Sequence, residues 1–540
     1  MTVFQSKIST SSDAYRQNYD EMKALVDKLK ELNARAPAKS ASRKERFENR
    51  GQLLPRERLA RLLDPGMPYF EISNLAGYLL DTEQEEKSVP GSTIMSGIGF
   101  INGARCVIVN DDSAIKAGAM TVAGGYRLQR GQEIALKQKL PFIHLVESAG
   151  GDLINYSVEG FLRGGTLFAN LARLSAAGLP VIAVLHGSST AGGAYMPGLS
   201  DYVIAVKDRG KAFLAGPPLL KAATGEIATD EELGGAEMHA SISGLVEYLA
   251  EDDGEAVLIA REIVQRLDWN RRCPALETGD VREPIYDPDE ILGIVPTDYR
   301  KPYDVREVVA RVVDGSDFSD FKPGYGVSTV CLQAEIYGMP CGIIGNNGPI
   351  DPDGATKAAQ FIQLCDQADT PLVFLQNTTG YLVGKQYEQA GMIKHGSKMI
   401  QAVTNVGIPR ITFMIGASYG AGNYGMCGRG YDPDFCVTWP NASTGVMGGE
   451  QAAQVMSIVA EGQAAAKGTE VNREQLAIQE KMLTHMFNRQ AGAFYTSGHL
   501  CDDGMIDPRD TRKTLGFLLA TTWEARNRTV KPNSFGVARM

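Results

Sequence analysis

An internal duplication is the feature of this sequence that most constrains its fold. The apolar run at residues 141–150 is matched by a similar run at residues 371–380. A second apolar run, at residues 179–187, is matched at nearly the same spacing by residues 408–416. Solenoid repeats have periods of about 20–50 residues, so a nearly constant spacing several times longer indicates two homologous domains.

These runs predict an α/β fold. Each is short, begins near a proline and ends at a glycine, which is typical of buried strands that alternate with helices. A strand–turn–strand pattern opens each copy, at residues 98–110 and 332–346. Residues 13–50 space their apolar side chains as a helix does, and residues 268–302 contain five prolines. We therefore expect a helical N-terminal extension, a first domain, a linker and a second domain, at residues 1–50, 51–275, 276–302 and 303–540.

The composition argues against several classes of protein. A net charge of −10 over 540 residues disfavours nucleic-acid binding, because neutralising phosphates requires a basic face. No apolar run approaches the ~20 residues that cross a bilayer, and the polar start lacks the pattern of a targeting peptide. The eight cysteines include no Cys-x-x-Cys pair, and the six histidines show no metal-ligand spacing. We expect a cytoplasmic protein with free thiols and no metal site, and neither nucleic acid nor membrane as a partner.

A basic segment precedes the first domain. It runs through residues 43–50 and continues with Arg56, Arg58 and Arg61. Such a run of charges is typical of a solvated face, and contact with an acidic ligand is the alternative.

A glycine-rich loop follows the second apolar run of each copy, at residues 187–195 (the first loop) and 416–424 (the second loop). Glycines between a strand and a helix leave backbone N–H groups bare for a ligand oxygen, and such donors stabilise charge that develops on a carbonyl oxygen. The plainer alternative is that the glycines only permit tight helix–sheet packing. Residues 147–151 and 377–381 are expected to lie beside these loops. Matched pairs in the two loops are Gly187 and Gly416, Ser189 and Ser418, Gly193 and Gly422, and Tyr195 and Tyr424.

Two short motifs in the second loop suggest other activities. Residues 416–420 match the Gly-x-Ser-x-Gly nucleophile elbow of serine hydrolases. Ser189 occupies the equivalent place in the first copy, however, and no histidine–acid pairing is evident. Residues 420–425 match the dinucleotide fingerprint, but a new apolar run at Phe435 leaves too little room for the crossover helix of that fold.

Several strings resemble the carboxyltransferase domains of biotin-dependent acyl-CoA carboxylases, and the resemblance covers nearly the whole chain. It implies two duplicated crotonase-like domains, each a ββα superhelix. Residues 384–386 and 394–396 are most similar to the β subunits that carboxylate geranyl-CoA or 3-methylcrotonyl-CoA. The strings that carry the family resemblance are residues 189–195, 213–218, 223–226, 303–306, 416–428 and 446–450.

The resemblance implies a different ligand for each loop. In this family the first domain holds acyl-CoA and the second holds biotin, across a dimer interface. Gly192 and Gly193 would donate to the thioester oxygen. Ala421, Gly422 and Asn423 would donate to the biotin ureido oxygen, and the larger Asn423 leaves the donor pair open. Further contacts to acyl-CoA are expected from Gly150, Gly151, Ala191, Tyr195 and Gly198. Lys116, Arg127 and Lys221 are candidates for contact with the CoA phosphates, and an ordinary surface or salt-bridge role is the alternative for each. Further contacts to biotin are expected from Thr379, Gly380, Tyr381 and Tyr424.

The implied chemistry is positioning and electrostatics. Carboxybiotin supplies CO₂ and a base for the γ-proton of a β-methyl-α,β-unsaturated thioester, whose dienolate oxygen lies in the first loop. Residues 198–202 and 349–354 look like those of geranyl-CoA carboxylases, and Gly198 leaves room for a longer tail. Geranyl-CoA is therefore the expected substrate and 3-methylcrotonyl-CoA the alternative. Propionyl- or acetyl-CoA carboxylation, decarboxylation and non-catalytic acyl-CoA binding are the remaining alternatives.

The resemblance also implies partners. The sequence has neither the Met-Lys-Met biotin-attachment motif nor a phosphate-binding loop for ATP. The resemblance implies an α subunit that carries biotin covalently and uses ATP and Mg²⁺ to carboxylate the biotin. It further implies a homo-hexamer of this chain within an α6β6 complex.

Overall fold

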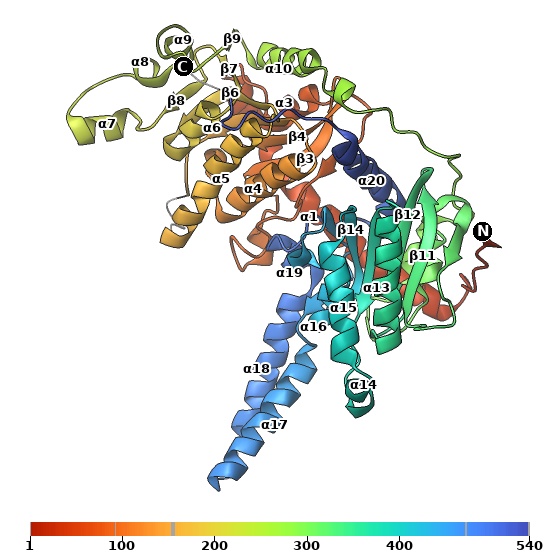
Figure 1. The fold of residues 1–540 in the computed structure, drawn as a ribbon. Coiled ribbons are helices and arrows are strands. Elements are labelled where there is room, and N and C mark those ends of the chain that lie inside the picture. The colour runs from red at the N-terminus through yellow and green to blue at the C-terminus, as the bar shows by residue number, and fades with distance from the viewer. Residues whose placement is uncertain (1, 92, 153–156, 470–471, 538–540) are drawn as a thin grey trace. The chain divides into compact units, whose positions relative to one another are not determined.

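The computed structural model describes residues 2–91, 93–152, 157–469 and 472–537 (Figure 1). The chain divides into two compact units, each built around one sheet. The N-half unit draws on residues 30–276, 498–500 and 520–540. The C-half unit draws on residues 1–29, 277–497 and 501–519. Each unit therefore takes segments from distant parts of the sequence.

The sheet of the N-half unit has the strand order β2-β3-β4-β5-β6-β7-β9, with β8 paired to β6. β3 and β4 form an antiparallel hairpin around Asn102 and Gly103, both with the positive φ that a tight turn requires. From β4 to β9 the neighbouring strands run parallel. The strands are β2 (Phe70–Glu71), β3 (Ile94–Ile101), β4 (Ala104–Asp111), β5 (Phe142–Ser148), β6 (Val181–Thr190), β7 (Tyr202–Val206), β8 (Lys211–Phe213) and β9 (Tyr248–Ala250).

Helices cover this sheet. α4 packs on β3 and β4 and lies beside α5, and α10 packs on β6, β7 and β9 (Figure 1). The side chain of Thr121 accepts a hydrogen bond from the Gly124 N–H and so begins α4. The helices of this unit are α2 (Lys44–Glu48), α3 (Pro55–Leu62), α4 (Val122–Lys137), α5 (Val158–Ala176), α6 (Tyr195–Gly198), α7 (Pro217–Thr224), α8 (Asp230–Gly234), α9 (Ala236–Met238) and α10 (Asp253–Leu267).

The sheet of the C-half unit repeats this plan, with the order β1-β10-β11-β12-β13-β14-β15 and β16 paired to β14. The β11–β12 hairpin is antiparallel, and β12 to β15 run parallel. The strands are β1 (Thr2–Val3), β10 (Asp317–Asp320), β11 (Thr329–Ile336), β12 (Met339–Asn346), β13 (Leu372–Thr378), β14 (Arg410–Tyr419), β15 (Phe435–Thr438) and β16 (Ser443–Gly445).

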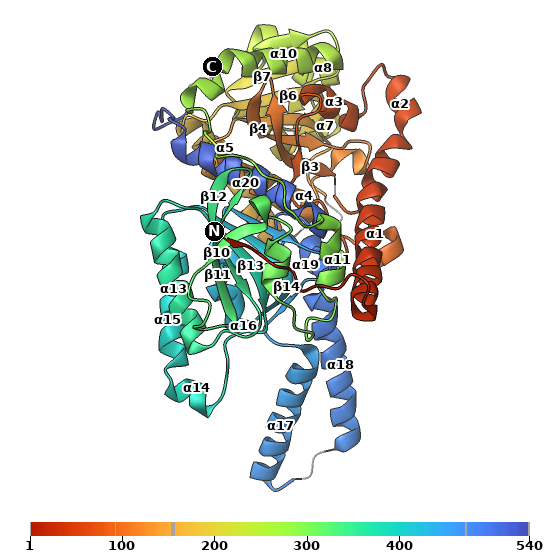
Figure 2. The ribbon, with the colours of Figure 1, turned by 90° about the vertical axis from the view of Figure 1, so that its right-hand side faces the viewer.

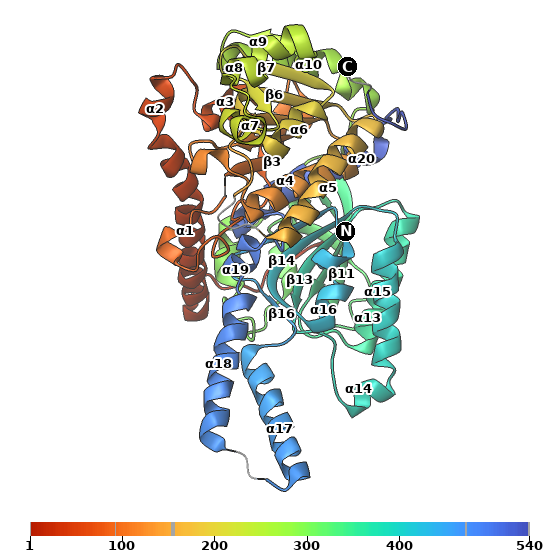
Figure 3. The same ribbon diagram turned by 90° about the vertical axis from the view of Figure 1, so that its left-hand side faces the viewer.

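The helices of the C-half unit include two packed pairs. α13 and α15 pack side by side along the sheet (Figure 2), and α17 and α18 form a long paired hairpin (Figure 3). The helices are α11 (Ile291–Ile294), α12 (Val305–Val309), α13 (Pro352–Gln367), α14 (Lys385–Gln389), α15 (Met392–Asn405), α16 (Gly420–Gly425), α17 (Gly449–Lys467) and α18 (Arg473–Ala491). Segments of both units contribute to α1 (Asp13–Ala41), α19 (Ala493–Gly498) and α20 (Thr511–Asn527).

The duplication extends to irregular details. The β5–β6 pairing shifts register between Val146 and Ser148, and the β13–β14 pairing shifts at the matching place, between Gln376 and Thr378. The mixed α/β architecture predicted from the sequence is confirmed.

A buried cation stands at the same place in α4 and α13. Arg127 and Lys357 occupy matching positions in the two copies, and both side chains are fully buried. Arg127 donates to the backbone carbonyls of Ile72, Gly91 and Ile94 and pairs with the carboxylate of Glu71. The expectation that Arg127 lies near the CoA phosphates is therefore wrong, because its guanidinium is fully used inside the unit.

Candidate functional site

The two glycine loops have the same backbone course. In the first loop β6 ends at Thr190, and residues Ala191–Ala194 form a 3₁₀ turn that leads into α6. In the second loop β14 ends at Tyr419, and α16 begins at Gly420. Ala191 and Gly420 occupy matching positions, and both have a φ of 54°. The N–H groups that follow lie in the first turn of a helix and lack intrahelical acceptors, so both loops present donors.

A further loop, at residues 147–151 and 377–381, adjoins each glycine loop, as expected. A Cβ on Gly150 would lie 3.1 Å from Thr190 Oγ1. In the C-half unit a Cβ on Gly422 would lie 2.8 Å from the Cα of Gly380. Gly150 and Gly380 both have positive φ, where glycine is favoured. The close approach of two backbones at Gly422 requires glycine there.

A cavity of about 460 Å³ lies beside the second loop, within the C-half unit. Arg429 is a cation in its lining and is paired with the buried carboxylate of Asp503 at 2.9 Å. Burial raises the pKa of Asp502, next in sequence to the lining residue Cys501, to about 6. The lining consists of Met414, Ser418, Gly420, Ala421, Asn423, Tyr424, Arg429, Thr444, Gly445, Val446, Thr496 and Cys501.

The remaining residues predicted to contact biotin do not line this cavity. Tyr381 packs beneath α16, where a Cβ on Gly425 would meet its hydroxyl, and burial raises the pKa of that hydroxyl. Thr379 and Gly380 are in the adjoining loop and do not line the cavity.

Side chains of the second loop and of the neighbouring strand β13 hold the second loop in place. Ser418 Oγ is buried and donates to Gln376 Oε1 at 2.5 Å, while Asn423 Nδ2 donates to Ser418 Oγ at 2.7 Å. Gln376 Nε2 donates in turn to the carbonyl of Met426 at 2.7 Å. Ser418 is thus a structural hydroxyl, which argues against the serine-hydrolase interpretation. The six-residue α16, followed by β15 at Phe435, leaves no crossover helix for a dinucleotide.

The first loop leads into an exposed aromatic side chain. Tyr195 is half exposed, and its ring centroid lies 6.0 Å from that of Phe168 on α5. A Cβ on Gly198, like one on Gly151, would meet no atom within 4 Å. Lys116 and Lys221 are both exposed in the same unit. Other exposed apolar side chains of this unit include Val158, Phe161, Leu162, Leu214 and Leu219.

A buried group of charges that no sequence motif indicated lies beneath the first loop. Arg58 is 1% exposed and donates to the carboxylate of Glu147 at 2.5 Å. The interpretation of the basic segment as a solvated face is therefore wrong for Arg58. The hydrogen bond from His186 and the charge of Arg58 outweigh burial and hold the pKa of Asp253 below its usual value. Burial and Arg58 lower the pKa of His186, so its ring is neutral.

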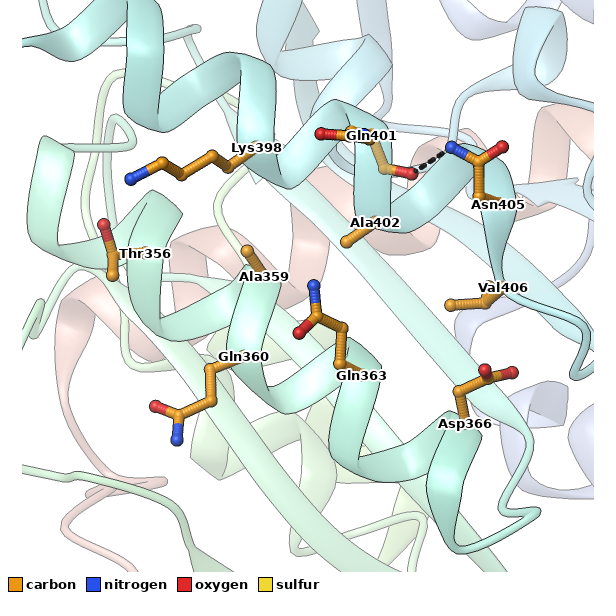
Figure 4. Close-up of a pocket in the computed structure, with 10 residues that line it drawn as sticks. All are labelled: Thr356, Ala359, Gln360, Gln363, Asp366, Lys398, Gln401, Ala402, Asn405 and Val406. Carbon is orange, nitrogen blue, oxygen red and sulfur yellow. Dashed lines mark hydrogen bonds between the residues drawn. The ribbon is translucent and has the colours of Figure 1, made fainter.

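A groove between α13 and α15 contains no residue of either glycine loop. Its volume is about 470 Å³, and Gln363 of α13 and Lys398 of α15 point into the space between the two helices (Figure 4). None of the predicted site residues lines it.

Two kinds of feature are absent from the described part of the chain. No group of three or more histidine, cysteine, aspartate or glutamate side chains is arranged to hold a metal ion. No helix there is both long enough and apolar enough to span a bilayer.

The fold and the paired loops agree with the comparisons to known proteins. The family described as carboxyl transferase domain matches residues 46–536, most of the chain. This chain belongs to the carboxyl transferase family. A probable biotin-dependent acyl-coenzyme A carboxylase beta2 subunit of Mycobacterium tuberculosis is 47% identical over 100% of both chains. The mitochondrial methylcrotonoyl-CoA carboxylase beta chain of Dictyostelium discoideum is 43% identical, over 100% of this chain and 91% of that protein.

A solved structure agrees with this carboxyltransferase along its whole length. The beta subunit of P. aeruginosa geranyl-CoA carboxylase is 51% identical and has a TM-score of 0.93, and the match covers 100% of both chains. The resemblance to the carboxyltransferase subunits of biotin-dependent acyl-CoA carboxylases is thus confirmed, as are the crotonase-like fold and the expectation of an enzyme.

Proposed function

We propose that this carboxyltransferase moves CO₂ from carboxybiotin to the γ-carbon of a β-methyl-α,β-unsaturated acyl-CoA, and that the acyl group is geranyl. The observation that carries the proposal is the pair of matched loops, each with bare N–H groups after a left-handed residue. Two carbonyl oxygens gain negative charge in this reaction, so two sets of donors are needed.

The first loop is assigned to the acyl thioester. The N–H groups of Gly192 and Gly193 donate to the thioester oxygen as the dienolate forms. A Cβ on Gly192 would lie 3.4 Å from Phe168, so that side of the loop is packed and a ligand approaches from the other. Tyr195 and Ala191 border the acyl chain and Gly198 leaves room for it, while Gly150 and Gly151 support the loop. Lys116 and Lys221 are the proposed cations for the CoA phosphates.

The second loop is assigned to biotin, which supplies the CO₂ and the base for the γ-proton when bound. The cavity of about 460 Å³ beside Ala421, Asn423 and Tyr424 fits a small bicyclic ring. The N–H groups of Ala421, Gly422 and Asn423 point a partial positive charge at a ureido oxygen. Thr379, Gly380 and Tyr381 support this loop from below.

The choice of geranyl-CoA draws on two observations. The geranyl-CoA carboxylase beta subunit is 51% identical over the whole chain. A side chain at position 198 would project into open space, so a long acyl tail has room there. 3-Methylcrotonyl-CoA is the second candidate, because methylcrotonoyl-CoA carboxylase beta chains are also similar over the whole length.

The proposal includes partners. A biotin carboxylase and carrier α subunit would hold biotin covalently and consume ATP and Mg²⁺. This chain would form a homo-hexamer within an α6β6 complex, with the first loop of one copy facing the second loop of another. We place the complex in the cytoplasm, without nucleic acid or membrane.

Reconstitution tests the proposal. The chain is combined with a biotinylated α subunit, ATP and bicarbonate, and kcat/KM is measured for geranyl-, 3-methylcrotonyl- and propionyl-CoA. We expect geranyl-CoA to have the highest kcat/KM. Turnover of propionyl-CoA alone would overturn the substrate class, and failure with every acyl-CoA would favour a non-catalytic acyl-CoA-binding protein.

A further inference from the structure

The buried charges beneath the first loop connect four elements of the N-half unit. Arg58 on α3 donates to Glu147 of β5 at 2.5 Å and lies 3.4 Å from a carboxylate oxygen of Asp253. Asp253, the first residue of α10, is hydrogen-bonded to His186 Nδ1 of β6 at 2.7 Å. One guanidinium therefore ties α3, β5, β6 and α10 together through two carboxylates.

This cluster touches the strand ends from which the loops leave. Glu147 is packed so closely over Gly187 that a Cβ there would lie 2.6 Å from Glu147 Cγ. The next residue, Ser148, pairs with Ser189 of β6. A displaced Glu147 side chain would let Gly187 move, and with it the N–H groups of the first loop a few residues later.

The first loop has few anchors of its own. Ser189 Oγ is fully buried, and no hydrogen-bond partner for it exists among the described residues. Ala194 stands where the second loop has Asn423, and Val146 where that unit has Gln376. The side-chain hydrogen bonds that hold the second loop therefore have no counterpart at these positions.

The second loop, conversely, has no such charges at the matching positions. Asn377 replaces Glu147, and its Oδ1 accepts a hydrogen bond from the N–H of Ala417 at 3.2 Å. Ile415 replaces His186. A neutral amide holds the strand end in the C-half unit, and an ion pair holds it in the N-half unit.

We propose that Arg58 and Glu147 are positioning residues for the first loop, whose ion pair fixes the ends of β5 and β6 so that the loop amides meet the thioester oxygen. This inference rests on the proposed function, which assigns the first loop to the acyl thioester. Donors in an oxyanion hole accelerate a reaction when they need no reorganisation as charge develops. A loosened loop therefore lowers kcat more than it weakens acyl-CoA binding, which draws on other contacts.

The test compares Glu147→Gln with Glu524→Gln. Glu524 pairs with buried Arg105 at 3.1 Å, and its side chain is 21% exposed against 16% for Glu147. Arg105 lies on β4, which leads into neither loop. Both variants are assembled with the α subunit, and kcat and KM are measured with geranyl-CoA. Decarboxylation of free carboxybiotin without acyl-CoA serves as a readout of the second loop.

We expect Glu147→Gln to lower kcat about 10-fold or more, with KM for geranyl-CoA and carboxybiotin decarboxylation within about 2-fold of wild type. Glu524→Gln should leave all three near wild type after correction for folded protein. An unchanged kcat in Glu147→Gln, or an equal loss of both activities, would overturn the inference while leaving the proposed function intact. Absence of wild-type turnover would overturn both.

Discussion

The first and second loops share a backbone but are held in place by different means. Both follow a parallel strand, and both begin with a residue at a φ of 54°. Ser418 of the second loop is hydrogen-bonded to Gln376 and Asn423, whereas Ser189 of the first has no hydrogen-bond partner within the described ranges. The first loop rests instead on a buried ion pair. Duplication preserved the donors, and the supporting side chains diverged.

The divergence matches the different ligands that we propose. The second loop would receive one invariant ring, which suits a framework closed by its own hydrogen bonds. The first loop would receive a flexible acyl chain, and it is followed by the exposed Tyr195 and by open space at Gly198. Charges below the loop fix its donors without narrowing that space.

The largest difference is expected between Gly422→Ala and Gly193→Ala. The new methyl group at 422 would lie 2.8 Å from backbone at Gly380. At 193 it would meet only Ser189 Oγ, at 2.9 Å, and displacing that hydroxyl breaks no hydrogen bond among the described residues. Gly422→Ala should lower kcat about 100-fold, the cost of a displaced oxyanion donor. Gly193→Ala should lower kcat much less. Steady-state carboxylation of geranyl-CoA measures both, and an equal loss would contradict the difference in packing.

Substrate choice is expected to depend on position 198 and not on its counterpart. Gly198→Leu should reduce the ratio of kcat/KM for geranyl-CoA over 3-methylcrotonyl-CoA about 10-fold or more, because the added carbons fill space for the longer tail. Cys427, at the matching position of the C-half unit, is fully buried, and Cys427→Ala is the matched control. A ratio unaffected by Gly198→Leu would remove Gly198 from the acyl pocket.

The matched serines provide a smaller contrast. Ser418→Ala removes the partner of both Gln376 and Asn423, and a buried group without its partner costs about 1–3 kcal/mol. We expect a roughly 10-fold lower kcat and a lower melting temperature. Ser189→Ala breaks no hydrogen bond among the described residues and should stay within about 2-fold. An inactive but folded Ser189→Ala enzyme would show that Ser189 takes part in the chemistry.

The smallest effects are expected in the pH dependence of stability, with opposite signs in the two units. The pKa of Asp253 is held below its usual 3.8, so its contribution is full above about pH 4 and is lost as pH falls. The pKa of Asp502 is raised to about 6, so the folded enzyme loses stability as pH rises from about 4 to 6. Melting temperatures from about pH 2 to 7 should show the deficit of Asp253→Asn growing with pH up to about pH 4, and that of Asp502→Asn shrinking between about pH 4 and 6. Parallel curves would contradict both shifts.

Much of the fold was predictable because its signals are local. Short apolar runs that end in glycine marked β5, β6, β13 and β14, and the constant spacing revealed the duplication. The glycine loops were found the same way, since bare N–H groups depend on local backbone geometry.

The supporting side chains were not predictable in the same way. Arg58 is one of several arginines in a charged segment, and only the turn of α3 decides that it faces inward. Arg127 looked like a ligand for phosphate, although the carbonyls that it binds come from loops and strands far from α4 in sequence. The partners of Ser418 likewise depend on the pairing of β13 with β14.

The central claim is that homologous loops hold different ligands, and acyl-CoA affinity tests it most directly. The Kd of geranyl-CoA is measured by calorimetry for the wild type, Gly193→Val and Gly422→Ala, each confirmed as folded. The account predicts that Gly193→Val weakens binding at least about 10-fold, because the valine blocks the thioester oxygen, while Gly422→Ala binds like the wild type despite its lost turnover. Normal affinity in Gly193→Val, with lost affinity in Gly422→Ala, would contradict it.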